Sequence, residues 1–83
     1  MNKSLGYLRE AISNYTDRNE QSISIDYKLQ NGSYQSERYF VDVLSDEEIS
    51  FLNSVLPDEI RYAMDEKDYQ RVHELNEVFE QLY

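Results

Sequence analysis

The pattern that most constrains the fold is an alternation of apolar and polar side chains on both sides of the dipeptide Asn31-Gly32. Before this dipeptide, every second residue is apolar, namely Ile23, Ile25, Tyr27 and Leu29. After it, the same alternation recurs at Tyr39, Val41 and Val43. A period of two is typical of a half-buried strand, and Asn-Gly favours the positive φ angles of tight turns. The pattern therefore predicts an antiparallel β-hairpin.

Only one register of this hairpin satisfies both its apolar residues and its charges. Pairing Ile25 with Tyr39 also places Asp26 opposite Arg38, so that opposite charges face each other. This register requires a three-residue loop over residues 31–33 or a bulge near residues 35–36. The hairpin alone would be marginal in water, so we expect helices to cover its apolar face.

Helical patterns lie on both sides of the expected hairpin. Leu5, Leu8, Ala11, Ile12 and Tyr15 recur at spacings of three and four, which predicts a helix that Ser4 would cap. Further along, Ser45 and Glu48 have the spacing of a capping box, with Leu44 and Ile49 as its hydrophobic staple. The helix that starts there has a stripe of apolar residues, and we expect Pro57 to end it.

A further helix is predicted from about residue 58. The polar run of residues 65–68 interrupts its apolar pattern, which resumes at Val72, and this predicts a turn there, with one long bent helix over residues 58–82 as the alternative. The predicted fold class is α+β, with an N-terminal helix, an antiparallel β-hairpin and two or three C-terminal helices packed on one face of the hairpin. At 83 residues, the chain is expected to be a single domain over residues 1–83.

The charge of the chain is unevenly distributed. Residues 1–41 are balanced, whereas residues 42–83 hold twelve acidic and three basic residues and so carry the whole net charge of −9. Such a surface repels phosphates and anionic lipids and attracts basic proteins, which predicts a protein partner with a basic surface, no direct nucleic acid and no membrane contact. Without a secretory signal or a long apolar run, the expected location is cytoplasmic.

Residue types that carry catalysis or bind metals are scarce. There is no cysteine, and His73 shares its helix with Glu77 and Glu80 but lacks the second histidine of a zinc motif. A solvated helix face explains His73 better than a metal site does. The two glycines cannot form a phosphate-binding loop. We therefore expect no enzyme, catalytic residue, cofactor or metal, with a small enzyme that uses carboxylates as a distant alternative.

The remaining functional hypothesis is a binding surface on the acidic C-terminal half. Tyrosines combine apolar contact with a polar tip and are enriched at interfaces. The sequence predicts a non-enzymatic protein-binding or regulatory module that docks a basic partner protein through Asp58, Glu59, Tyr62, Asp65, Glu66, Tyr69, Glu74 and Glu77. The alternative is a homodimer that associates through the hairpin edge or an apolar helix face.

Five of the other tyrosines divide into two groups. Those on the apolar faces are expected in the core, namely Tyr15, Tyr27 and Tyr39. Tyr34 and Tyr83 lie off these faces and are additional interface candidates.

One short segment resembles a known module. The run Ile60-Arg61-Tyr62-Ala63-Met64, followed by Asp68, Val72 and Leu75, is similar to the IDEAL domain of small bacterial proteins. Arg61 and Tyr62 replace the acidic pair of the family pattern, and only residues 60–75 are covered. The resemblance implies a small intracellular bacterial protein of non-enzymatic role, and it implies no site residues.

Overall fold

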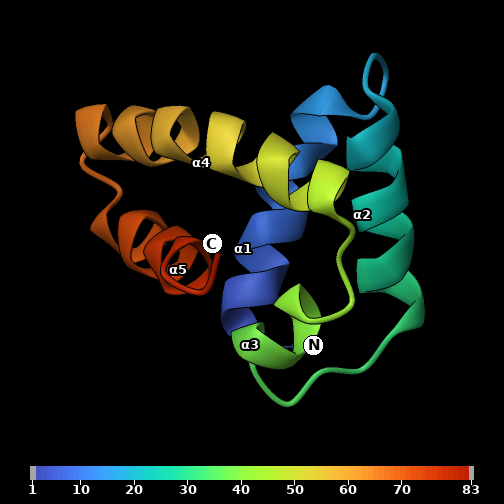
Figure 1. Cartoon of the computed structure of the whole chain (residues 1–83). Coiled ribbons are helices and arrows are strands. Elements are labelled where there is room, and N and C mark those ends of the chain that lie inside the picture. The colour runs from blue at the N-terminus through green and yellow to red at the C-terminus, as the bar shows by residue number, and fades with distance from the viewer. Residues whose placement is uncertain (1, 83) are drawn as a thin grey trace.

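The computed structural model describes residues 2–82, and throughout that range the regular elements are helices, with no β-strand (Figure 1). In chain order they are α1 (Lys3–Ile12), the 3₁₀ turn η1 (Ser13–Tyr15), α2 (Glu20–Asn31), α3 (Glu37–Val41), α4 (Asp46–Asp65) and α5 (Tyr69–Phe79). Helix α1 lies between α2 and α5, and α4 packs across both of these neighbours. The predicted α+β fold with a β-hairpin is therefore wrong.

The first alternating run forms α2 instead of a strand. Asn19 caps this helix by accepting a hydrogen bond from the Ser22 backbone N at 3.0 Å. Ser22, Ile25 and Leu29 face the core, whereas Ile23 and Tyr27 are 53% and 67% exposed. When every second residue is apolar, residues i and i+4 are also both apolar, and these two positions lie on the same face of a helix. The short run therefore fitted both elements, and the small buried Ser22 completes the helical face.

The second alternating run is the short helix α3, capped by Ser36. The adjacent residues Phe40 and Val41 are both fully buried, whereas Tyr39 and Val43 are 57% and 48% exposed. Two buried neighbours cannot both point to one face of a strand, so tertiary packing selected the helix. The predicted pairing of Ile25 with Tyr39 does not occur.

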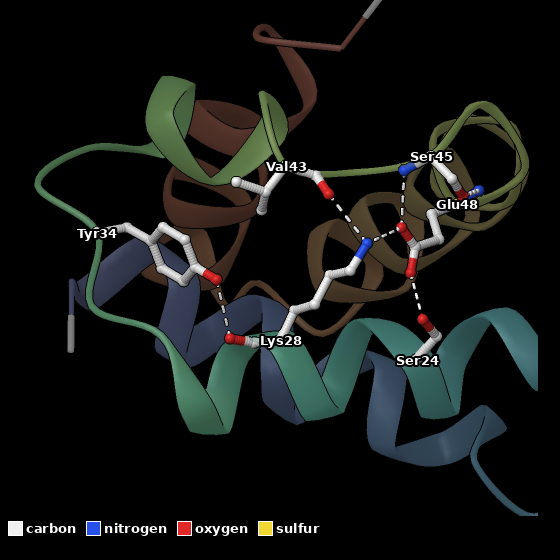
Figure 2. Close-up of polar contacts among 6 residues, drawn as sticks. All are labelled: Ser24, Lys28, Tyr34, Val43, Ser45 and Glu48. Atoms are coloured by element: carbon white, nitrogen blue, oxygen red, sulfur yellow. Dashed lines mark hydrogen bonds and ion pairs between the residues drawn. The ribbon is translucent and has the colours of Figure 1, made fainter.

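Asn31-Gly32 ends α2 and does not form a hairpin loop. Gly32 has extended backbone angles, with φ −117° and ψ 166°. Its Cα lies under the ring of Tyr34, where a Cβ atom would overlap the phenol. The Tyr34 hydroxyl donates to the Lys28 carbonyl at 2.9 Å (Figure 2), and the ring packs edge-on against Phe40. Glycine is needed here for close approach and not for a positive φ.

The predicted N-terminal helix is confirmed, with a different cap. Leu5, Leu8 and Ile12 are at most 1% exposed. The capping residue is Asn2, whose side-chain oxygen accepts from the backbone N of Ser4 at 2.8 Å. Ser4 lies inside the helix and faces the core.

Helix α4 begins as predicted but continues past the expected end. The Ser45–Glu48 capping box is present in both directions. Pro57 lies inside the helix and is exposed to solvent. An interior proline costs about 3 kcal/mol, yet Leu52, Leu56 and Ala63 keep one buried stripe across it. Burial of this stripe explains why the helix continues to Asp65.

The turn at residues 65–68 is confirmed, and a single helix over residues 58–82 is wrong. Lys67 adopts a positive φ of 59°, and the backbone N of Asp68 donates to the Ala63 carbonyl at 2.9 Å. The Asp68 side chain then caps α5 by accepting from the Arg71 backbone N at 3.2 Å.

No helix of the described residues is long and apolar enough to cross a membrane.

A buried carboxylate joins α2 to the first turn of α4 (Figure 2). Glu48 is 3% exposed and accepts hydrogen bonds from Ser24 Oγ at 2.5 Å, Lys28 Nζ at 2.5 Å and Ser45 N at 2.7 Å. Lys28 Nζ also donates to the Val43 carbonyl at 2.9 Å. Burial alone would raise the pKa of Glu48, but these donors outweigh burial and hold the pKa below its usual 4.5.

Replacing this carboxylate should destabilise the protein and flatten its pH dependence. Because the folded state lowers the pKa of Glu48, its stabilisation is complete above about pH 4.5 and is lost as the pH falls through the folded pKa. We expect Glu48→Gln to reduce the free energy of unfolding by about 1–2 kcal/mol at neutral pH. Urea titrations from neutral to acidic pH, followed by circular dichroism, measure both effects.

The exposed neighbour Glu47 provides the matched control. Glu47→Gln removes the same charge from the same helical turn, and its cost should stay near about 0.5 kcal/mol. Equal costs for the two variants would show that the contacts of Glu48 contribute nothing beyond its charge at the helix start.

The two glycines should respond in opposite directions to substitution by alanine. A Cβ at Gly32 would meet the Tyr34 ring, so Gly32→Ala should cost about 1–3 kcal/mol. Gly6 lies inside α1 with no other atom within 4 Å of an added Cβ, so Gly6→Ala should stabilise by about 0.5–1 kcal/mol. Urea unfolding of both variants checks the pair, and a harmless Gly32→Ala would refute the packing of Tyr34 over Gly32.

Candidate functional site

The candidate site is an open groove where the end of α1, the C-terminal half of α4 and the start of α5 meet. Its volume is about 500 Å³. The residues that line it are mostly polar or acidic: Glu10, Ala11, Ser13, Asn14, Glu59, Tyr62, Ala63, Glu66, Asp68 and Arg71. The groove therefore has the negative character of the C-terminal half, with one guanidinium in its wall.

Arg71 is held between carboxylates from two elements. Its Nη2 lies 2.6 Å from Glu10 Oε1 on α1, and its Nε lies 3.1 Å from Asp68 Oδ2 at the start of α5. The guanidinium carbon also lies 5.3 Å from the centre of the Tyr7 ring. The hydrogen bond to Glu10 is the main reason why the pKa of Arg71 is raised above its ordinary value. Arg71 thus links α1 to α5, and its charge is already matched.

Tyr15 connects η1 to α4 at the edge of the groove. Its hydroxyl donates to Glu59 Oε2 at 2.9 Å, and its ring packs edge-on against Phe51 at 5.6 Å between centroids. Burial, with the neighbouring Glu59 carboxylate, raises the pKa of Tyr15 to about 12. The phenol is a fixed hydrogen-bond donor at neutral pH, which is a structural task. Tyr27 and Tyr39, also expected in the core, are exposed instead.

The structure brings together only part of the predicted partner surface. Glu59, Tyr62 and Glu66 line the groove, and the side chains of Asp65 and Tyr69 are exposed outside its lining. Asp58 and Glu77 are half-buried and pair with Arg61 and His73. Tyr34 is packed over Gly32, and Tyr83 lies outside the described residues.

Glu74 is an internal contact and not part of an exposed surface. It is 7% exposed, and it accepts hydrogen bonds from Ser4 Oγ at 2.7 Å and Gln70 Nε2 at 2.6 Å. The Ser4 hydroxyl is the main reason why the pKa of Glu74 is lowered. Helical spacing places Ser4 on the same face as Leu8 and Glu74 on the same face as Val78, but it does not show that the two polar residues meet.

His73 and its neighbours give no sign of metal binding. The His73 side chain is 66% exposed, and its Nε2 lies 3.6 Å from Glu77 Oε1. Within residues 2–82, no three or more His, Asp or Glu side chains are placed to hold a metal ion. Every buried side-chain nitrogen or oxygen of the described range also has a hydrogen-bond partner.

Most of the positive charges are committed to intramolecular ion pairs. Within residues 2–82, six of the eight lysines and arginines lie within 4.0 Å of a side-chain carboxylate: Arg9, Arg18, Lys28, Arg38, Arg61 and Arg71. The pairs at Arg18 and Arg38 are well exposed and so contribute little to stability. The groove is therefore a largely acidic surface whose one arginine is already paired with carboxylates.

A curated bacterial protein is similar to this chain over nearly its whole length. The Sigma-G-dependent sporulation-specific SASP protein of Bacillus subtilis (strain 168) is 49% identical over 82 residues, which cover 99% of each chain. No solved structure matches the chain. The similarity covers the full helical fold, including the predicted partner surface and the groove.

These findings correct the functional predictions. The predicted regulatory module that docks a basic protein, with its homodimeric alternative, is wrong because the relative is a sporulation SASP protein. The same finding overturns the prediction of no direct nucleic acid. Acidic composition supports solubility as readily as it supports partner choice, so net charge was a poor guide.

The predicted resemblance to the IDEAL domain is wrong, because the similarities found extend over the whole chain and concern other proteins. The model of a different family matches residues 1–83, and the chain belongs to that family, described as CsgA, minor curli fiber component A.

Proposed function

We propose that this chain is a non-enzymatic, sporulation-specific small acid-soluble protein that acts in the cytoplasm of the developing spore. The observation that carries the proposal is the 49% identity with the Bacillus subtilis protein over nearly the whole chain. The family description instead concerns a fiber. Residues 2–82 contain no strand whose unpaired edge could start a β-sheet fiber, so the proposal follows the sporulation protein.

The charge of the chain accounts for solubility in acid. At neutral pH the net charge is −9, and the isoelectric point is near 4.4. In strong acid the 17 carboxylates become neutral while eight lysines and arginines and one histidine remain positive. The net charge then reverses to roughly +9, and a charge far from zero keeps a chain in solution.

Acid also weakens the fold itself. Glu48 and Glu74 are the two buried acidic side chains among the described residues, and hydrogen bonds lower the pKa of each. Their contacts connect α2 with α4 and α1 with α5. Protonation removes stabilisation from both contacts as the pH falls through the folded pKa values. Solubility in acid therefore depends on positive charge and does not require an intact fold.

Nucleic acid is the first partner to test. It was excluded only because of the negative net charge, and the similarity to a SASP protein overturns that exclusion. Contact with phosphates requires lysine or arginine side chains. Most of these side chains are paired with carboxylates, so DNA would have to displace the carboxylates from them. Anisotropy titrations with labelled duplex DNA at low and physiological salt address this contact. Binding that weakens with salt identifies phosphate contacts, and no binding at low salt places the protein away from DNA.

The proposal predicts that the protein accumulates only when sigma-G is active. The gene, with its own upstream region, is placed in Bacillus subtilis strains with and without sigma-G, and acid extracts of growing and sporulating cells are analysed by mass spectrometry. We expect the protein only in extracts of sporulating cells that contain sigma-G. The Bacillus relative in the same extracts is the control. Accumulation during growth, or without sigma-G, would refute the proposal.

A further inference from the structure

The dipeptide Asn31-Gly32 combines three features that make an asparagine chemically unstable. Both residues are exposed, and they lie at the junction of α2 and the following loop. Gly32 has no side chain to hinder attack by its own backbone nitrogen on the preceding residue. The third feature is the state of that nitrogen in the fold.

The backbone N of Gly32 makes no short, well-aligned hydrogen bond to any described residue. At a regular helix end it would donate to the Lys28 carbonyl four residues earlier. That carbonyl accepts a hydrogen bond from the Tyr34 hydroxyl at 2.9 Å, as Figure 2 shows. By contrast, the backbone N at the ends of α1, α3, α4 and α5 each donates to a carbonyl with good geometry.

The Asn31 side chain is held by one exposed contact. Its Nδ2 donates to the Tyr27 carbonyl at 2.9 Å, one turn back in α2. This contact lies in the last turn of the helix, where fraying opens hydrogen bonds at little cost in free energy. When it opens, the carboxamide is free to rotate toward the Gly32 nitrogen.

We infer that Asn31-Gly32 is a site of spontaneous deamidation in the folded protein. The deprotonated Gly32 nitrogen attacks Asn31 Cγ, a new C–N bond forms, and the Cγ–Nδ2 bond breaks with release of ammonia, which takes a proton from water. The resulting five-membered succinimide then adds one water. Opening at the side-chain carbonyl gives aspartate, and opening at the backbone carbonyl gives isoaspartate.

Either product alters the end of α2. Both place a new negative charge at the helix C-terminus, where the helix dipole disfavours anions. Isoaspartate also adds one carbon atom to the backbone next to Gly32, which disturbs the packing of Tyr34 above it. The modification thus acts on the contact that directs the chain from α2 toward α3.

The test compares asparagines within one folded protein. The full chain is kept at mildly alkaline pH and body temperature, and deamidation is followed by peptide mapping and mass spectrometry. Asn14 and Asn76 are exposed internal controls, and Asn76 lies inside α5. We expect Asn31 to react first, at a rate within about tenfold of its rate in urea, because frayed helix ends open with a free energy near zero.

Two outcomes overturn the inference. One is that Asn31 reacts no faster than Asn14 and Asn76 in the folded protein. The other is protection of Asn31 by more than about tenfold relative to urea, which would mean that the helix end stays closed. Asn31→Gln is the matched variant: it should remain intact and keep its stability during incubation, while the parent protein becomes less stable as the products accumulate.

Discussion

The structure depends on the burial of one helix, α1, between its neighbours. Leu5, Leu8 and Ile12 are almost completely removed from water, and α1 packs on both α2 and α5. Such burial is the main favourable term in folding, and it is large relative to the net stability of a small domain. Helix α4 crosses the neighbours and completes the enclosure, so every longer helix contributes its apolar stripe to one core.

Polar contacts then fix how these helices are placed relative to one another. Glu48 joins α2 to α4, Glu74 joins α5 to α1, and Arg71 joins α5 to Glu10 on α1. The two glutamates are buried and satisfied by several donors, and removing a single donor would leave a buried charge short of partners. At neutral pH these contacts fix the relative positions of the helices. In acid the glutamates become protonated and the fold is weakened, while positive charge keeps the chain soluble.

The sequence predicted those elements that have more than one local signal. The capping box at Ser45 and Glu48 predicted the start of α4, and the polar run before Tyr69 favoured the turn to α5 over one long helix. The α2 segment had only one signal, alternation over eight residues, which is compatible with a strand and with a helix. The apolar residues Ile23 and Tyr27 supported the strand because their exposure in the fold cannot be read from residue type.

In the candidate site, too, the sequence predicted some of the residues and missed others. Glu59, Tyr62 and Glu66 were proposed as part of a surface from their charge and from the frequency of tyrosine at interfaces, and the structure places them along one groove. Glu10 and Arg71 were not proposed, because their contact joins residues that are 61 positions apart. No local pattern records such a contact. The role of the protein was predicted wrongly, since net charge describes solubility more directly than it describes a partner.

By itself, the sequence determined which residues are apolar, where α4 begins, and how the net charge varies with pH. These properties follow from residue type and from neighbours within one helical turn. Only the tertiary structure decided that α2 is a helix, that α4 continues through Pro57, and that Glu74 is internal. Each of these depends on the free energy of burying one face against other helices, and that free energy depends on contacts that short sequence patterns do not encode.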